Sequence, residues 1–473
     1  MHQDDGIVFN GVNASTGRYL SETTSAAELA RTIRGEKLAG DDLADIRLRA
    51  QGGDEHFGVP FNVDAENLAQ AGWGLLVPQD TPDDVLEAIA PLRDLRREQA
   101  GDRYYEFTGA AAPKIGESKQ RWLARHKMGP GKPNPSKVPY YLLILDDPEK
   151  ISYQMQYQLD VQYAVGRLSF DTAEAYAVYA ESVVAAERKP RPGARRLELF
   201  GPTNSGDRAT ALSSRQLLCP LAADVRNFGD GWLVETSIGD TATKQRLRSL
   251  LCEKDGPSVL FTASHGLAFN VDDPLQLDAQ GALLCQDWPG PIRWSKPIPA
   301  DFYLSAADID GAVMPEVIIS FACFGAGTPQ LDDFAHLNRA GAQPIAKRSF
   351  VARLPQRLLS DPHGHALAFV GHVERAWGCS FTWPGAGEQI DAFSECLQAV
   401  LSGLRIGHAL ESFNQRHADL SAELSDTLFK IQQHHKLVPD VELARMWTAN
   451  NDARSYVLVG DPAVRAPSAA ATL

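Results

Sequence analysis

The sequence has few cysteines and no cysteine pair of the kind that binds zinc. Six cysteines are spread over 473 residues, and no two of them stand in a CxxC spacing. Zinc ribbons depend on such pairs, and secreted domains held by disulfides depend on a much denser set of cysteines. The sequence therefore predicts neither framework, and a reducing cytoplasm is the compartment that we expect.

The chain also lacks an excess of positive charge and any long apolar run. Lys and Arg number 46 against 60 Asp and Glu, a formal net charge of −14. Proteins that bind nucleic acid neutralise phosphates with clustered Lys and Arg, so we expect no nucleic-acid partner. No apolar run approaches the length of a membrane span, so we expect no membrane partner. The N-terminus, MHQDDGIVFN, lacks the basic start and apolar stretch of a secretion signal.

The length exceeds what one compact core usually serves, so more than one domain is expected. The polar, basic and proline-broken stretch RKPRPGARR (Arg188 to Arg196) marks the predicted boundary. We predict an N-terminal α/β subdomain over residues 1–188 and a second subdomain over residues 189–473. Residues 1–50 are the hardest to interpret, and we expect a partly ordered lead-in there.

The second half of the chain alternates apolar strand-like segments with helical ones. The strand candidates LELF, WLVET, VLFTA, VIISFA and ALAFV begin at Leu197, Trp232, Val259, Val317 and Ala366. Continuous apolar strands separated by helices are typical of a parallel sheet that helices cover on both faces. The sequence therefore predicts an α/β fold with a mainly parallel sheet flanked by helices, preceded by a smaller α/β subdomain.

Two of these strands run directly into a reactive side chain. VLFTASHG carries His265, and VIISFACFG carries Cys323. Active groups gather at the carboxyl edge of a parallel sheet, and an imidazole near a thiol helps to form the nucleophilic thiolate. The N–H groups of Gly266 and Cys323 are candidates for holding an oxyanion, since Gly266 has no side chain to keep a substrate carbonyl away. A single buried cysteine is usually an inert hydrophobic residue, and a single histidine after a strand is usually a structural residue. The two together, in this order and each at a strand end, indicate nucleophilic catalysis.

The order His-Gly after one strand and Ala-Cys after the next resembles the caspase-like cysteine peptidases, which include caspases, legumain, separase, gingipains and CHAT-domain proteins. YVLVGDPAVR (Tyr456 to Arg465) resembles the terminal Gly-Asp-Pro segment of the gingipain-like and CHAT-like branch. Val138 to Phe170 resembles the strand and Val-Gly-Arg region of the smaller subdomain that precedes the catalytic one in gingipains. The resemblance implies a caspase-like fold and a cysteine endopeptidase that needs no cofactor.

The resemblance also implies roles for individual residues. Cys323 would be the nucleophile and His265 the general acid and base. Gingipains place an acidic residue near the histidine, after the first strand of the catalytic subdomain, and Asp207 in LELFGPTNSGD takes that place here. An aspartate that caps a turn is the alternative interpretation of Asp207, and Glu235 is a competing acid. We expect Cys323 to be the one essential thiol and the first to be alkylated.

The specificity pocket is expected against ALAFVGHVERAWGCSF, the strand after the cysteine strand and its continuation. There Trp377 is a candidate aromatic wall, and Glu374 or Arg375 would select the charge of the residue before the cut. A core tryptophan and a solvated Glu–Arg pair are the alternative. The HxH of His363 and His365 has no third ligand at a clear spacing, and DDPLQLD (residues 272–278) lacks the pattern of a calcium loop, so no metal site is expected.

The expected function is cleavage of a protein or peptide substrate through a thioester, in an intracellular regulatory or defence role that leaves room for a regulatory partner protein. Gingipains are secreted and carry a signal segment, whereas this sequence shows none. A non-catalytic CHAT-like interaction module and a transpeptidase or amidase on the same site stay open as alternatives. A phosphate-binding enzyme is disfavoured, because GPTNSGDRAT lacks the GK[ST] ending of a P-loop.

Overall fold

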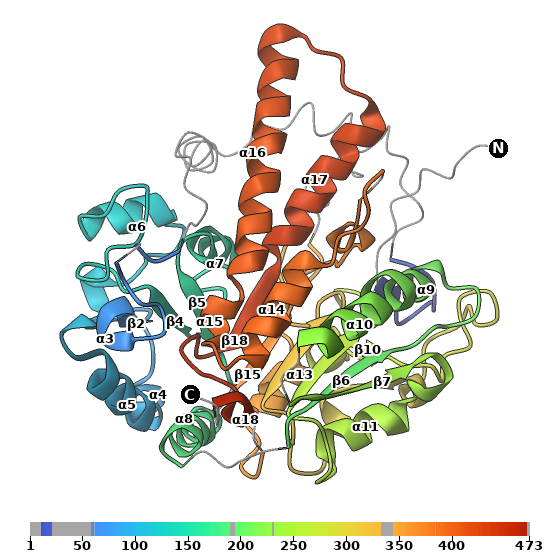
Figure 1. The fold of residues 1–473 in the computed structure, drawn as a ribbon, viewed down its shortest axis with the longest axis horizontal. Helices are drawn as coiled ribbons and strands as arrows, with labels where there is room; N and C mark the ends of the chain where they lie inside the picture. The colour runs from blue at the N-terminus through green and yellow to red at the C-terminus, as the bar shows by residue number, and fades with distance from the viewer. Residues whose placement is uncertain are drawn as a thin grey trace.

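A computed structural model describes residues 11–20, 58–60, 62–189, 194–228, 231–332, 344–364, 366–383 and 385–470. A ten-stranded sheet in the order β3-β2-β4-β5-β18-β15-β12-β8-β6-β7 forms the centre of the molecule (Figure 1). The strands are β2 (Trp73–Leu76), β3 (Tyr104–Phe107), β4 (Tyr141–Leu145), β5 (Ala164–Leu168), β6 (Arg196–Gly201), β7 (Leu233–Ile238), β8 (Val259–Ala263), β12 (Val317–Phe321), β15 (Ala368–His372) and β18 (Tyr456–Gly460).

The sheet is mainly parallel. Only β15 and β18 run antiparallel to each other, and the other neighbouring strands of this sheet are parallel. Every residue of β4, β8, β12 and β15 is buried, as the continuous apolar runs of these strands require. The predicted fold class, an α/β protein with a mainly parallel sheet flanked by helices, is confirmed.

Helices cover the sheet, and one helical hairpin projects well beyond it (Figure 1). The helices are α3 (Leu68–Ala71), α4 (Asp83–Ala88), α5 (Ala90–Ala100), α6 (Lys119–Arg125), α7 (Tyr153–Asp160), α8 (Ala173–Arg188), α9 (Arg208–Ser213), α10 (Cys219–Phe228), α11 (Lys244–Cys252), α12 (Gln276–Ala279), α13 (Arg353–Leu359), α14 (Asp391–Leu401), α15 (Ile406–Ala409), α16 (Glu411–His434), α17 (Asp440–Arg454) and α18 (Pro467–Ala470). The hairpin consists of α16 and α17, which pack against each other.

Both halves of the chain contribute to the one sheet. β18, from the C-terminal end, pairs with β15 on one side and with β5 on the other. The approach of β18 to β5 is close, because a Cβ built on Gly166 would lie 2.1 Å from the carbonyl oxygen of Gly460. Only glycine fits at residue 166 without a shift of the backbone. The division of the chain at residue 188 stays a prediction.

A buried ion cluster fastens the C-terminal Gly-Asp-Pro segment to the N-terminal half. Arg96 Nε on α5 lies 2.7 Å from Asp461 Oδ2, and Arg96 Nη2 lies 2.6 Å from Glu187 Oε1 on α8. The indole N–H of Trp73 donates to Asp461 Oδ1 over 2.9 Å. Because Arg96 and Asp461 are fully buried, each charge depends on the other for its solvation.

A second, four-stranded sheet has the order β1-β9-β10-β11 and includes residues from the predicted lead-in. Its strands are β1 (Gly11–Asn13), β9 (Gly266–Ala268), β10 (Leu283–Leu284) and β11 (Tyr303–Leu304). Two small pairs complete the strands: β13 (Gly327–Thr328) with β14 (Phe350–Val351), and β16 (Thr382–Trp383) with β17 (Gly387–Glu388). β1 runs parallel to β9, so the part of residues 1–50 that the structure describes is built into the fold.

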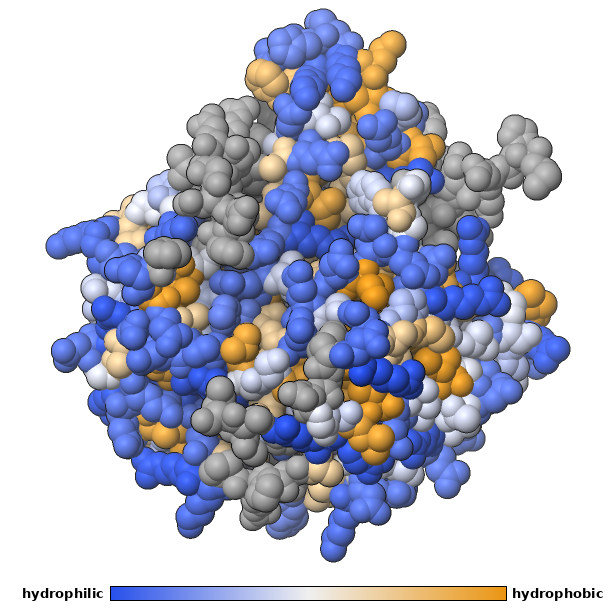
Figure 2. All heavy atoms as spheres, viewed as in Figure 1, coloured by the Kyte–Doolittle hydropathy of each residue, from blue (hydrophilic) through white to orange (hydrophobic). Residues whose placement is uncertain are grey.

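The surface in Figure 2 is hydrophilic over most of the visible face, with hydrophobic residues in small separate groups. Among the described residues, no helix has both the length and the apolar character that crossing a membrane requires.

Candidate active site

His265 and Cys323 lie opposite each other at the carboxyl edge of the large sheet. β8 and β12 are neighbours in register, with Ala263 opposite Phe321. The backbone N–H of Ser264 still donates to the carbonyl oxygen of Phe321 over 3.1 Å. Past the strand ends the two loops stay close, because a Cβ built on Gly266 would lie 1.7 Å from the carbonyl oxygen of Cys323. Two apolar strands that end together therefore bring the loops that carry His265 and Cys323 to the same edge of the sheet.

Asp207 binds the imidazole from the next strand. It follows β6, the other neighbour of β8, and its Oδ2 lies 2.7 Å from His265 Nε2. Asp207 also caps the N-terminus of α9, where it accepts hydrogen bonds from the N–H groups of Ala209 and Thr210 and from the Thr210 hydroxyl. Asp207 therefore makes both of the contacts expected from the sequence, one with the histidine and one as a local cap.

The carboxyl group of Asp207 is held in its charged form. Burial alone raises the pKa of Asp207, but the facing His265 imidazole and the hydrogen bonds from Thr210 and Tyr19 outweigh burial and lower that pKa to about 2. A carboxylate here fixes the orientation of the imidazole.

The other ring nitrogen of His265 has no hydrogen-bond partner among the described residues. His265 Nδ1 is buried, and the ring packs against aromatic side chains, with its centroid 5.8 Å from that of Tyr19 and 6.0 Å from that of Trp288. Buried polar atoms are usually paired, so Nδ1 can take a partner that the described residues do not supply. With Nε2 bound to Asp207, Nδ1 is the nitrogen that remains for proton exchange.

The thiol of Cys323 is closed off from solvent. Cys323 is fully buried, and its Sγ lies 3.2 Å from the backbone N of Ala376, which donates to it. Burial raises the pKa of the Cys323 thiol to about 12, although the Ala376 N–H and the nearby Arg375 guanidinium lower it in part. The resting thiol is therefore protonated. Cys219 is exposed, so access alone favours its alkylation, and the priority of Cys323 stays a prediction.

The loop after the thiol is held against the continuation of β15. The Phe324 N–H donates to the Glu374 carbonyl over 2.6 Å, and the Ala326 N–H donates to the His372 carbonyl over 2.9 Å. Phe324 and Glu374 both have left-handed backbone angles, with φ of 58° and 73°. Such angles cost about 1–2 kcal/mol in a residue other than glycine, so this strain is concentrated beside Cys323.

The structure gives a different steric reason for glycine at position 266 from the one predicted. A Cβ at Gly266 would lie 1.7 Å from the carbonyl oxygen of Cys323. The missing side chain therefore admits the backbone of the cysteine loop itself rather than a substrate carbonyl. The role of the Gly266 and Cys323 N–H groups as oxyanion donors stays a prediction.

The competing acid, Glu235, is engaged elsewhere. Its Oε2 lies 2.6 Å from Arg196 Nη2. Arg196 is the first residue of β6, whereas Asp207 follows the last. Glu235 therefore pairs at the amino end of the strand whose carboxyl end leads to Asp207.

The three predicted pocket residues lie on the far side of Cys323, after β15. Trp377 is 8% exposed, and its N–H donates to Asp452 Oδ1 over 2.8 Å. Arg375 Nη1 lies 2.6 Å both from Glu374 Oε1 and from Asp332 Oδ1. This ion pair is buried rather than solvated, with Glu374 1% exposed. The order along the sheet edge is thus Trp377 and its neighbours, Cys323, His265 and Asp207.

Among the described residues, the metal candidates form no cluster. His363 is exposed, and His365 lies outside the described residues. Asp272 is 92% exposed and pairs with Lys347. In the part of the chain that the structure describes, no group of three or more His, Cys, Asp or Glu is placed to hold a metal ion.

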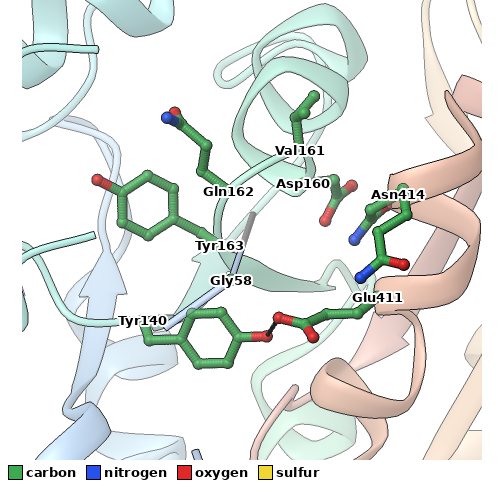
Figure 3. A pocket seen from close by; sticks show the side chains of 9 residues that line it. Gly58, Tyr140, Asp160, Val161, Gln162, Tyr163, Glu411 and Asn414 are labelled. Carbon is green, nitrogen blue, oxygen red and sulfur yellow. Dashed lines mark hydrogen bonds between the residues drawn. The ribbon is translucent and has the colours of Figure 1, made fainter. Parts of the chain in front are cut away.

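A small pocket lies away from this constellation. Figure 3 shows it between the end of α7 and the start of α16, where the Tyr140 hydroxyl donates to Glu411 Oε1 over 2.8 Å. Asp160, Gln162 and Asn414 also line it. None of the predicted site residues lines this pocket.

Sequence reasoning missed four residues that touch the site: Gly11, Tyr19, Leu20 and Ala376. The Tyr19 hydroxyl donates to Asp207 Oδ1. A Cβ on Gly11 would lie 3.1 Å from Cys323 Sγ and 2.6 Å from a methyl carbon of Leu20. A three-residue strand carries no readable periodicity, so no local signal could have found Gly11.

No model of a known protein family matches this chain, and neither does any curated protein. Solved structures that match the chain include gingipain R, an Arg-specific cysteine proteinase (12% identity, 85% of this chain and 78% of that one, TM-score 0.45). A structure described as a protease gives 13% identity over 84% and 78% of the two chains, with a TM-score of 0.46. A complex of the Porphyromonas gingivalis RgpB pro- and mature domains gives 12% identity over 83% and 79%, with a TM-score of 0.42.

Proposed function

We propose that this protein is a cysteine endopeptidase of the caspase-like kind, in which Cys323 is the nucleophile and His265 the general acid and base. One observation carries the proposal. His265 and Cys323 follow paired strands in register, and His265 is bound to Asp207 through Nε2 while its buried Nδ1 has no hydrogen-bond partner among the described residues. A general base beside a thiol needs one ring nitrogen held by a carboxylate and the other free to exchange a proton.

The reaction follows from these groups. His265 takes the thiol proton, and the Cys323 thiolate attacks the carbonyl carbon of a peptide bond, so that a carbon–sulfur bond forms. The N–H groups of Gly266 and Cys323 hold the oxyanion. His265 then protonates the leaving amine, the carbon–nitrogen bond breaks, and a thioester remains. Water, deprotonated by His265, attacks the thioester and releases the acid and the thiol.

Asp207 acts through His265 and does not touch the substrate in this proposal. Its carboxylate accepts from Nε2, which leaves Nδ1 to exchange the proton with the thiol. The negative charge stabilises the imidazolium that forms with the thiolate. The segment Glu374–Trp377, whose Ala376 N–H contacts the thiol, is proposed as the wall of the substrate pocket.

Proteome-wide cleavage profiling tests the proposal. Purified wild-type protein and Cys323→Ala would each be incubated with a denatured cell extract, and new N-termini would be identified by mass spectrometry. Wild-type protein should create a set of new termini with a shared residue before the cut, and Cys323→Ala should create none. Identical termini in both samples would rule out Cys323 as the nucleophile. New termini joined to an added amine would instead indicate a transpeptidase.

A non-catalytic interaction module of the CHAT-like kind is the second candidate function. The observation that favours it is the complete burial of both Cys323 and His265 in the resting structure. An absence of new termini, even after the thiol has been made accessible, would decide for this module.

A further inference from the structure

The thiol is covered by the chain's own N-terminal residues. β1 adds to the free edge of β9 in parallel register, with Gly11 opposite Gly266, the residue after His265. Gly11 lies close to the sulfur, since a Cβ built on it would lie 3.1 Å from Cys323 Sγ. An extended stretch of backbone therefore lies beside the nucleophile, paired to a strand by main-chain hydrogen bonds.

A turn then returns the chain over the same place. The Asn13 N–H donates to the Arg18 carbonyl over 2.8 Å, and the Leu20 N–H donates to the Gly11 carbonyl over 3.2 Å. Tyr19 is thereby placed with its hydroxyl on Asp207 and its ring against His265. We name residues Gly11–Leu20 the N-terminal strap.

The strap thus contacts all three residues of the proposed mechanism. Leu20 also packs against the hydrophobic cluster that contains Trp377, on the opposite side of the thiol. Substrate needs this same volume, because a scissile carbonyl must come within about 3–3.5 Å of the sulfur. While the strap is in place, there is no room for a peptide at Cys323.

We propose that the edge of β9 beside Cys323 is a binding site for an extended peptide with glycine at the thiol, and that Gly11–Asn13 of the strap fill it as an internal occupant. The assignment rests on the proposed function. Main-chain pairing to a strand edge is indifferent to most side chains, so an external peptide can take the register that β1 takes. Glycine is preferred beside the sulfur, because a Cβ there would lie 3.1 Å from Sγ, which is tighter than an ordinary contact.

The position of β1 allows the exchange. β1 is the outermost strand of its sheet and is three residues long, and β9 is its neighbour in that sheet. Its departure leaves β9 with unpaired N–H and C=O groups, which is the condition in which a sheet edge accepts another strand. Departure also frees the Asp207–His265 pair from Tyr19 and opens Cys323 to substrate.

The rate of alkylation of Cys323 by iodoacetamide in the full chain tests the cover. Leu20→Asp places a charge among apolar neighbours, and Gly11→Val brings atoms into contact with Leu20 and Sγ, so both should loosen the strap. We expect both variants to be alkylated at Cys323 at least about tenfold faster than wild type, because opening limits access to a buried thiol. Thr16→Asp, an equal change at an exposed residue of the strap, should leave the rate unchanged. Peptide mass mapping separates Cys323 from Cys219.

Two peptides then test the site itself. A synthetic FNGVNASTGRYL, the sequence of residues 9–20, should slow the alkylation of Cys323 in Leu20→Asp. The same peptide with valine in place of the Gly11 equivalent should protect much less. Equal alkylation of wild type, Leu20→Asp and Gly11→Val would overturn the cover, and equal protection by both peptides, or by neither, would overturn the glycine site. Alkylation requires only access to the thiol, so a freely alkylated variant that cleaves nothing would contradict the proposed peptidase and leave the strap assignment intact.

Discussion

His265 Nε2 lies 2.7 Å from Asp207 Oδ2, and both side chains are completely buried. The two residues come from loops that follow neighbouring strands, β8 and β6, and meet at the edge where Cys323 also lies. A buried carboxylate is tolerated because His265, Thr210 and Tyr19 all donate to it. The Asp207 carboxylate is therefore already bound to His265 in the structure without substrate.

Replacing the nucleophile should remove turnover and leave the fold intact. In Cys323→Ala the methyl group occupies the space of the Cβ, and the residue is surrounded by the buried core, so we expect a loss of stability of about 1–2 kcal/mol at most. Peptide cleavage, measured on a substrate taken from the cleavage profile, should fall below detection. Retention of near-wild-type cleavage would show that the mechanism is wrong.

Replacing the acid should weaken catalysis without abolishing it. Asp207→Asn keeps an oxygen that can cap α9, but it removes the charge that supports the imidazolium. We expect kcat/KM to fall about ten- to a thousandfold, which corresponds to about 1.4–4 kcal/mol of barrier. Glu235→Gln is the matched control and should keep its full rate, since Glu235 pairs with Arg196. The reverse result would assign the role to Glu235, and full rates in both would mean that the dyad works without either acid.

The Asp207–His265 pair should also affect how the free energy of unfolding changes at acid pH. A carboxyl group whose pKa is lowered in the folded state stabilises the fold at pH values above its unfolded pKa, which is about 3.9 for aspartate. This stabilisation is lost as the pH falls through the folded pKa, which is about 2 for Asp207. Wild-type protein should therefore lose about 2 kcal/mol of unfolding free energy between pH 5 and pH 2 on account of Asp207. Urea titrations of wild type and Asp207→Asn over this range measure the difference. Parallel curves for the two proteins would contradict the lowered pKa.

Breaking the buried ion cluster should cost far more stability than breaking an exposed pair. Asp461→Asn removes one of two carboxylates from the fully buried Arg96 and leaves only Glu187 to neutralise it. We expect a loss of about 3 kcal/mol. Asp94→Asn is the matched control, because its pair with Arg97 is largely exposed and should contribute less than about 0.5 kcal/mol. Urea unfolding of both variants measures the contrast, and equal losses would mean that the cluster does not hold the two halves together.

The sequence by itself determined the strands and the residues that follow them. The apolar runs at Val259 and Val317 are β8 and β12, because five consecutive buried residues satisfy both faces of a covered sheet. His265 and Cys323 stand just past the ends of these runs, so the place of each could be predicted from local pattern. Asp207 was predicted from resemblance, and its contact with His265 required the structure.

Tertiary structure alone decided which segments lie beside these strands. Three features join residues that are far apart in the chain. They are the position of β18 between β15 and β5, the burial of the Arg375 ion pair and the closure of the thiol by the strap. Gly11 lies 255 positions before its partner Gly266 (266 − 11), and the tripeptide GVN has no period that announces its strand. Local sequence sets the shape of a segment through backbone preference and side-chain burial. The choice of partner depends on the free energy of the whole packed assembly, to which three residues contribute too little to be read in advance.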